Sequence, residues 1–180
     1  MLTNILVLLE QDDWHRDMCF LLQNLCEEFE FEIAQFYKIN NLRRENGSRY
    51  QIMACKGQPF HTEENIKKSN LDFFLECSGE IVIEKKDDGI IQDCWKSKKH
   101  IWVQNVQFLS SDSFTRKYQA IECGVQSCLL MPYTVDGEFK GCVEFFSMEE
   151  WPEIPKLVEK LKYYSTKYTR KEIDPMAFKV

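Results

Sequence analysis

Apolar and polar residues alternate along residues 128–147 in the pattern of a β-hairpin. Asp136 and Gly137 separate two largely apolar runs, and this dipeptide favours a tight turn whose twist matches that of the flanking strands. The first run is apolar on both faces, so we expect it in the middle of a sheet that is covered on both sides. Alternation in the second run predicts one face made of Phe139, Gly141, Val143 and Phe145 and another made of Lys140, Cys142, Glu144 and Phe146.

Similar patterns predict the elements around this hairpin. Apolar residues recur at helical spacing near both ends of the chain, which predicts two amphipathic helices, the second of them rich in lysine. The predicted helices cover residues 12–29, 62–78, 90–98, 111–124 and 154–164, and the further strands cover residues 33–39, 50–55, 80–84 and 101–106. An antiparallel sheet between terminal helices, with short helices over its middle, is an α+β fold.

Length and composition allow one well-packed domain. The chain has 180 residues, of which 44% are hydrophobic and 13% aromatic. We expect a single domain over residues 1–173 and a loosely held tail over residues 174–180. The 23 basic and 29 acidic residues leave a formal charge of −6, which disfavours binding to nucleic acid. The apolar residues 5–9 form too short a run for the core of a signal peptide or for a membrane span.

The eight cysteines indicate a reducing compartment. They form no Cys-x-x-Cys pair and no secretory signal precedes them, so we expect mostly free thiols in a cytoplasmic or nuclear protein. The three histidines, His15, His61 and His100, match no spacing of metal ligands. His100 directly precedes a predicted strand. We consider two interpretations of it: an exposed residue at the start of the strand, or a residue that faces a haem or responds to pH.

Segments in the middle of the chain, including Cys-Gly-Val-Gln-Ser at 123–127 and Gly-Cys-Val-Glu-Phe-Phe-Ser at 141–147, resemble GAF sensory domains. Together with residues 89–106, 114–120 and 130–132, they follow the order found in GAF domains of signalling kinases and other regulators. The resemblance implies an antiparallel sheet with both terminal helices on one face. On the other face it implies short helices and loops over a pocket, which holds a small molecule in many members. It also implies a homodimer paired through the terminal helices.

The matched elements imply which side chains line this pocket. Arg116 stands where the family often has a basic residue above the pocket, so it is a candidate partner for a ligand carboxylate or phosphate. A surface ion pair with Asp112 competes with that role. Glu144 lies inside a predicted strand, so we expect a basic or amide group beside it. Besides Arg116, the implied ligand-binding residues are Trp95, Trp102, Phe108, Phe114, Tyr118, Leu130 and Phe145. Trp102 is the foremost of these, and ordinary core packing competes as the interpretation of the aromatic residues.

Subtype motifs narrow the range of ligands. A covalent bilin is disfavoured because none of the cysteines is followed by histidine, and a cyclic nucleotide is disfavoured because the Asn-Lys-hydrophobic-Asp-Glu signature is absent. Another member of the family, the free methionine sulfoxide reductase, uses a cysteine of low pKa and a resolving partner in the pocket. If the chain is such an enzyme, Cys94 or Cys123 should be exposed, with a depressed pKa and a second thiol in reach.

The sequence therefore favours a regulatory module that performs no chemistry itself. By its resemblance, it binds a small molecule or a partner protein in a GAF-type pocket and transmits the state through its terminal helices. Two alternatives stay open. One is the cysteine-dependent sulfoxide reductase, and the other is a scaffold or dimerisation domain whose pocket is filled by its own side chains. No motif identifies a cofactor.

Overall fold

A computed structural model of the chain describes residues 21–22, 24–26, 28–44, 47–56, 73–74, 77–78, 88–135 and 137–167. A five-stranded antiparallel sheet forms its centre, with the strand order β2-β1-β5-β4-β3. The strands are β1 (Ile33–Arg44), β2 (Gly47–Lys56), β3 (Ile101–Val103), β4 (Ser127–Val135) and β5 (Glu138–Ser147). The helices are α3 (Ile90–Ser97), the 3₁₀ helix η1 (Val106–Phe108), α4 (Lys117–Glu122) and α5 (Pro155–Lys167).

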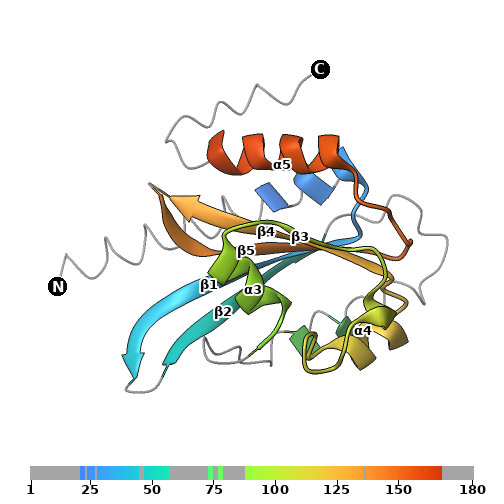
Figure 1. The fold of residues 1–180 in the computed structure, drawn as a ribbon, viewed down its shortest axis with the longest axis horizontal. Coiled ribbons are helices and arrows are strands. Elements are labelled where there is room, and N and C mark those ends of the chain that lie inside the picture. The colour runs from blue at the N-terminus through green and yellow to red at the C-terminus, as the bar shows by residue number, and fades with distance from the viewer. Residues whose placement is uncertain are drawn as a thin grey trace.

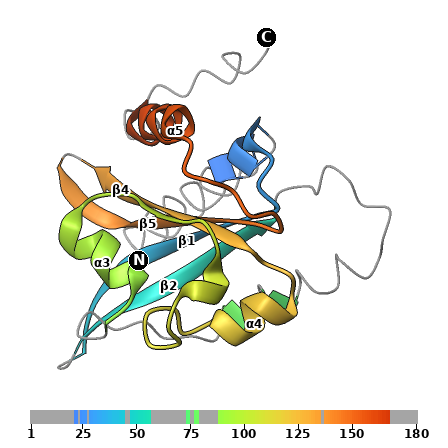
Figure 2. The same cartoon turned by 45° about the vertical axis from the view of Figure 1, so that its right-hand side comes forward.

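Helices cover both faces of the sheet (Figures 1 and 2). α5 and the helical residues among 21–29 lie on one face, and α3 and α4 lie on the other. We call these the α5 face and the α3/α4 face. The two helical segments on the α5 face come from opposite ends of the described chain. This arrangement confirms the predicted α+β fold class, with terminal helices on one face and short helices on the other.

The α5 face is closed by the apolar stripe that the sequence predicts for the last helix. Leu157 and Leu161 of α5 are buried against the sheet. Phe31 packs there beside two aromatic rings, with centroids 4.9 Å from that of Phe145 and 5.3 Å from that of Trp151. The other buried residues of this core are Leu21, Leu22, Leu25, Cys26, Ala34, Phe36, Leu129, Met131, Tyr133, Val143 and Val158.

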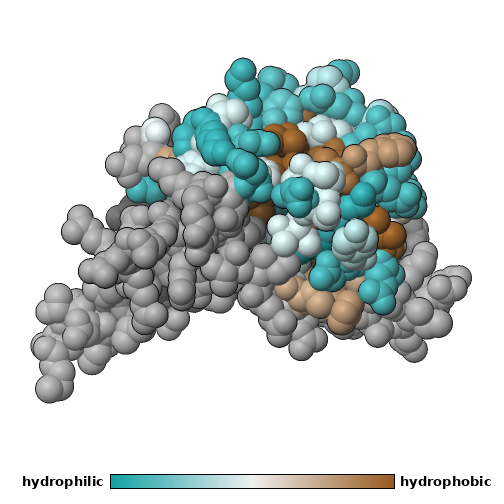
Figure 3. All heavy atoms as spheres, turned by 60° about the horizontal axis from the view of Figure 1, so that its bottom comes forward, coloured by the Kyte–Doolittle hydropathy of each residue, from teal (hydrophilic) through white to brown (hydrophobic). Residues whose placement is uncertain are grey.

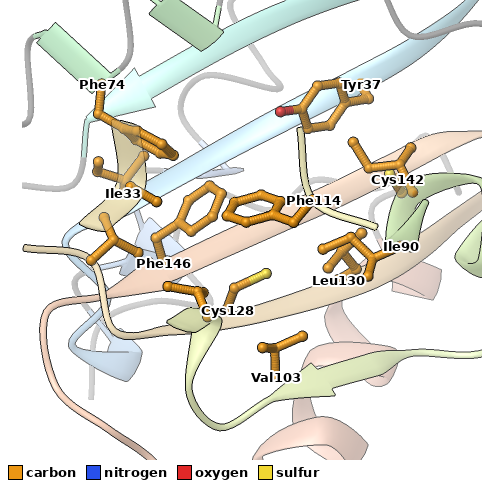
Figure 4. Packing of buried hydrophobic residues seen from close by; sticks show 14 of the residues in the cluster. Ile33, Tyr37, Phe74, Ile90, Val103, Phe114, Cys128, Leu130, Cys142 and Phe146 are labelled. Carbon is orange, nitrogen blue, oxygen red and sulfur yellow. The ribbon is translucent and has the colours of Figure 1, made fainter. Parts of the chain in front are cut away.

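A second core fills the space between the sheet and the short helices (Figure 4). Successive residues of a strand point alternately to the two cores; in β1, Ile33 and Tyr37 face the short helices, whereas Phe36 faces α5. The other buried residues of this core are Phe74, Ile90, Ile91, Cys94, Val103, Val106, Phe114, Ala120, Cys123, Val125, Cys128, Leu130, Cys142 and Phe146. The sheet is therefore covered on both sides, as the apolar character of β4 predicts.

The hairpin of β4 and β5 contains a β-bulge that changes one predicted face. The register shifts between Tyr133 and Thr134, which leaves Lys140 of β5 as an extra residue. Because an extra residue reverses the alternation beyond it, Phe139 lies on the α3/α4 face, and the face predicted for it is wrong. There its ring stacks on that of Trp95, with centroids 5.7 Å apart.

The segment between β5 and α5 is fastened to the edge strand β3 and the residues beside it. The indole Nε1 of Trp102 donates a hydrogen bond to the backbone oxygen of Trp151 at 2.9 Å. His100 Nε2 lies 2.9 Å from a carboxylate oxygen of Glu153, so this histidine contacts the approach to α5. Glu150 accepts hydrogen bonds at 2.9 and 3.0 Å from two amide side chains that follow β3. These contacts fix the direction from which the chain enters α5.

Two elements are shorter than predicted. The strand expected over 101–106 ends at Val103, because the side chain of Asn105 accepts a backbone hydrogen bond at 2.9 Å and caps η1. The helix expected over 111–124 begins only at Lys117, because turns closed by local serine hydrogen bonds precede it. Local side-chain bonds of this kind compete with regular elements and are hard to place from the sequence.

Part of the predicted pattern lies outside the described residues. This holds for the strand over 80–84, the tail over 174–180, residues 12–20 of the helix over 12–29, most of the helix over 62–78, and His15 and His61. In the ranges that are described, no helix is long and apolar enough to cross a membrane.

The close approach of β1 and β5 gives a test of the register. A Cβ atom added at Gly141 would lie 2.0 Å from the backbone oxygen of Tyr37, so Gly141→Ala should push the two strands apart and lower the free energy of unfolding by about 3 kcal/mol. The control is Gly137→Ala, whose Cβ meets nothing within 4 Å but whose φ of +79° disfavours alanine. We expect it to cost about 1 kcal/mol in urea unfolding. Equal effects of the two substitutions would contradict this register.

Candidate functional site

Two charged side chains meet in the core of the α3/α4 face. Glu144 stands in the middle of β5, opposite Gln35 of β1 and Leu130 of β4. Alternation turns its carboxylate toward the short helices, where it is 0% exposed. Arg116, the residue before α4, is 2% exposed. Among the residues whose side chains the structure describes, Arg116 and Glu144 are the two charged residues that are buried.

The guanidinium of Arg116 makes three side-chain hydrogen bonds. Its Nη2 donates to Oε2 of Glu144 at 2.5 Å, and its Nη1 donates to Oε1 of Gln35 at 3.0 Å and to Oγ of Ser78 at 3.2 Å. Tyr37 donates its hydroxyl to the same Oε1 of Gln35 at 2.9 Å. The thiol of one further residue, Cys128, lies 3.7 Å from Oε1 of Glu144 as a weak donor. We call these six residues the Arg116–Glu144 cluster.

Aromatic rings enclose the same guanidinium. Its central carbon lies 5.3 Å from the ring centroid of Tyr37, 5.6 Å from that of Phe74, 5.0 Å from that of Phe114 and 5.4 Å from that of Phe146. These four rings gather on one side of the sheet (Figure 4). A cation within about 6 Å of a ring centroid is attracted by the negative face of the ring, and more strongly where water is excluded.

The cluster is hidden from the surface. Seen from the side that carries α3 and α4, the described surface is largely hydrophilic, with separate hydrophobic patches (Figure 3). One donor inside the cluster stays unpaired: Nε2 of Gln35 is buried and has no hydrogen-bond partner among the described residues. A buried donor without a partner costs about 1–3 kcal/mol. The cluster therefore contains both a desolvated ion pair and an unsatisfied amide, and both lower the stability of the core relative to apolar side chains of similar size.

The predicted ligand-binding residues divide into four groups. Phe114, Arg116 and Leu130 lie together in the core of the α3/α4 face. Trp95 is partly buried at the edge of that core. Phe108 and Tyr118 belong to the surface of the protein, since 86% and 70% of these side chains are exposed.

Trp102 and Phe145 lie on the opposite face, so the expectation that they share a face with Phe114 is wrong. Trp102 pairs with Leu129, and Leu129 pairs with Phe145, and all three pack with α5. A strand residue points to one face only, and for Trp102 the sequence left that face open. The hydrogen bond of its indole to Trp151 holds the ring on this side.

The partners of Arg116 and Glu144 in the structure can be set beside those predicted from the sequence. The basic or amide group predicted beside Glu144 is confirmed, and it is the basic residue Arg116. The surface ion pair of Arg116 with Asp112 is wrong, because Arg116 is buried and pairs across the core. Sequence reasoning missed four of the cluster residues, Gln35, Tyr37, Ser78 and Cys128. Gln35 gave a usable signal, since an amide at an inward position of an apolar strand needs a partner.

Comparison with solved structures shows which known fold this arrangement of sheet and helices resembles. The GAF domain region of a putative membrane protein from Geobacter sulfurreducens has a TM-score of 0.65 and 15% identity, with 91% of this chain and 95% of that one covered. The chain has a GAF-like fold. A family-model scan and a search of curated proteins gave no match.

Other structures with this GAF-like fold differ in what they do. A type II free methionine-R-sulfoxide reductase from Thermoplasma acidophilum has a TM-score of 0.53 and 14% identity, with 84% of this chain and 86% of that one covered. A far-red cyanobacteriochrome photoreceptor has a TM-score of 0.55 and 14% identity, with 94% and 96% covered. At such identities the likeness concerns the fold, so the function of this GAF-like chain must be argued from its own residues.

Charge balance in the GAF-like core keeps Arg116 ionised. Burial by itself lowers the pKa of Arg116, but the adjacent charge of Glu144 outweighs it, so the pKa lies above its ordinary value. Burial also raises the pKa of Tyr37 well above its usual range. The hydroxyl of Tyr37 thus stays protonated and continues to donate to Gln35.

The thiols do not form the site that the reductase alternative requires. Cys94 and Cys123 are both buried, so neither is the exposed thiol that this alternative requires, and burial raises the pKa of Cys123. Burial raises the pKa of Cys128, and a hydrogen bond with Cys94 together with burial raises that of Cys142. The raised pKa values hold the thiols of Cys123, Cys128 and Cys142 in the protonated, unreactive form. Cys77, Cys94, Cys123, Cys128 and Cys142 form no disulfide bond, and no group of side chains in the described ranges has the composition of a metal site.

Removing one member of the ion pair should be far more damaging than removing both. Glu144→Leu leaves the buried Arg116 charge without its carboxylate, so we expect the free energy of unfolding to fall by about 3–5 kcal/mol. In Arg116→Met/Glu144→Leu, apolar side chains replace the pair, and most of that loss should be recovered. Lys162→Ala, which breaks the exposed pair with Glu159, is the control and should cost less than about 1 kcal/mol in urea unfolding. If Glu144→Leu lowers the free energy of unfolding no more than Lys162→Ala does, Arg116 and Glu144 do not form a buried ion pair.

The raised thiol pKa values predict a loss of stability in alkali. The folded state holds the protons of Cys128 and Cys142 more tightly than the unfolded chain, whose thiols titrate near about 8.5, so folding is favoured below that pH and weakens above it. Between about pH 9 and 10 the free energy of unfolding should fall by up to about 1.4 kcal/mol per pH unit for each thiol. Urea unfolding at several pH values measures the slope. The double variant Cys128→Ala/Cys142→Ala should make the free energy of unfolding depend less on pH above about pH 9, whereas Cys77→Ser should leave this slope unchanged. A slope that stays the same in the double variant would show that these two thiols are not its cause.

Proposed function

We propose that this chain is a regulatory module that performs no chemistry itself, and that the Arg116–Glu144 cluster is its responsive part. Support comes from the fold, which it shares with GAF domains of sensory proteins such as the photoreceptor. Further support comes from the position of the cluster, beneath the short helices on the face where the GAF resemblance implies a ligand. The module binds a small molecule or a partner protein there and passes its state to the terminal helices.

The observation that carries the proposal is the buried ion pair with an unpaired amide beside it. An apolar pair of similar volume would fill the same space without the desolvation of two charges, and such replacements are often neutral or stabilising. Gln35 Nε2 adds the cost of an unsatisfied donor. Groups that lower stability in this way concentrate at functional sites, because they are kept for what they do when contacts change.

The sheet offers a direct route from the cluster to α5. Glu144 belongs to β5, and the chain continues from Ser147 through residues 148–154 into α5. This connecting segment is held against β3 and its neighbours by the contacts of Trp102 and His100. A change in the position of Glu144 therefore acts on the strand that leads to α5. In this proposal α5, with the N-terminal helix beside it, carries the output and pairs protomers or contacts a partner.

Two other functions compete with this proposal. A thiol reductase is disfavoured by the burial of Cys94 and Cys123 and by the raised pKa of Cys123. A scaffold with a filled core accounts for the burial of Arg116, but it gives no reason for a charged pair at that position. The regulatory proposal does, because an ion pair can be exchanged for contacts with a ligand.

Hydrogen exchange tests the coupling between Arg116 and α5. Arg116→Lys keeps the positive charge but replaces the planar fork, so it cannot reach Glu144, Gln35 and Ser78 together. We expect the amides of residues 155–167 to lose about tenfold in protection in this variant. Lys96→Ala breaks an exposed pair with Asp88 in the same helical layer and serves as the matched control, with no change expected in α5.

Native mass spectrometry of the freshly purified protein tests the binding part of the proposal. A retained small molecule, or a specific complex with a partner or a second protomer, supports a regulatory module. An unbound monomer whose α5 is as protected in Arg116→Lys as in the wild type would instead favour a passive scaffold and end the proposal.

A further inference from the structure

We infer that the side chain of Arg116 is the internal occupant of a site built for a planar cation, and that a guanidinium compound binds there when Arg116 leaves. The inference rests on the proposed function, since it assigns a ligand class to the same cluster. Its evidence is separate, however. It comes from two observations: Arg116 can leave its place in the core more easily than Glu144 can, and the groups that remain there match a planar cation.

Glu144 is the fixed member of the pair. It lies in the middle of β5, between Gln35 on one neighbouring strand and Leu130 on the other, so it cannot leave without breaking the centre of the sheet. Arg116 stands at the start of α4, a helix of six residues, after turns that are closed by short-range hydrogen bonds. No side-chain cap fixes this helix start. Withdrawal of the Arg116 side chain therefore shifts a short helix start and the turns before it, whereas displacement of Glu144 would break the pairing of three strands.

The groups that Arg116 would leave behind define the ligand. The carboxylate of Glu144, Oε1 of Gln35 and Oγ of Ser78 now accept its three N–H bonds. Around them stand four aromatic rings with centroids 5.0–5.6 Å from the guanidinium carbon. A negative charge, acceptors spread in a fork and aromatic walls together match a flat, delocalised cation with several N–H groups.

Other ligand classes fit these groups less well. An anion would be repelled by the buried carboxylate of Glu144. An ammonium is a compact, strongly hydrated point charge that cannot reach all three acceptors at once. A quaternary ammonium satisfies the rings but has no N–H, so it replaces none of the hydrogen bonds that Arg116 donates to Glu144, Gln35 and Ser78. A guanidinium satisfies both the rings and the acceptors.

The unpaired amide of Gln35 points to a ligand larger than guanidinium itself. The guanidinium of Arg116 has five N–H donors and no acceptor, so it cannot satisfy the Nε2 donor of Gln35. A ligand that carries an oxygen next to its guanidinium group can do so. This donor gives such a ligand one contact that the internal side chain lacks, which is what a competitor of a tethered group needs.

Removing the Arg116 side chain should open the site to a simple probe. We choose 1-methylguanidinium, with tetramethylammonium and sodium chloride at equal ionic strength as controls. A ligand at about ten times its dissociation constant raises the folding equilibrium constant about elevenfold. We expect 1-methylguanidinium to stabilise Arg116→Ala in this way and the two controls to give at most a small salt effect.

Arg116→Met is the matched control variant. It also leaves Glu144 without its partner, but a long apolar side chain stays in the site, so 1-methylguanidinium should not stabilise it. If Arg116→Ala shows no cooperative unfolding by itself, the probe should restore it. Arg116→Ala/Glu144→Gln removes the buried charge as well, so it should fold without the probe and bind it at least about tenfold more weakly.

Three results would overturn the inference. They are the absence of any stabilisation or restored folding of Arg116→Ala by 1-methylguanidinium, equal stabilisation by tetramethylammonium, and equal responses of Arg116→Ala and Arg116→Met. None of them bears on the exchange measurement with Arg116→Lys, which uses no ligand. If that variant loosens α5 while Arg116→Ala ignores the probe, the regulatory proposal stands and the cation site is rejected.

Discussion

The charge of Arg116 can stay inside this protein because the carboxylate of Glu144 lies 2.5 Å away. Each charge alone would carry a desolvation penalty of several kcal/mol, so each position in the fold depends on the other. Glu144 is placed by the sheet and Arg116 by the short helical layer. The pair therefore locks that layer onto the sheet, and the aromatic residues Phe74, Phe114 and Phe146 close around it.

Strand alternation explains why one site can influence the opposite face. In β5, Glu144 faces the short helices while its neighbours Val143 and Phe145 face α5. A shift of the strand at this point moves both sets of contacts. The segment from β5 into α5 is also held to the edge strand through Trp102. The sheet is thus both the floor of the cluster and the support of α5, which makes a mechanical link without any long-range pathway.

Local patterns in the sequence predicted much of this fold. The turn between β4 and β5 and the stripe of α5 were recognisable because each depends on residues close together in the chain. The sequence did not show on which face of the sheet Trp102 lies. Its strand is short and has apolar and polar residues on both sides of it, so the pattern does not tell which face carries the helices. The polar residue in β5 showed that Glu144 needs a partner, yet Arg116 is 28 residues away and contacts it through tertiary packing. Ser78 gave no signal, since a single serine is compatible with any environment.

The most direct test of this account is the arginine side-chain NMR spectrum of the wild-type protein. A guanidinium that is buried, hydrogen-bonded to Glu144, Gln35 and Ser78 and enclosed by rings should rotate slowly and exchange its Nη protons slowly. We predict one arginine with resolved, protected Nη–H signals, shifted by the rings and absent in Arg116→Lys. If every arginine of the protein shows averaged, rapidly exchanging signals, the guanidinium is solvated, and neither the locked pair nor anything built on it can be correct.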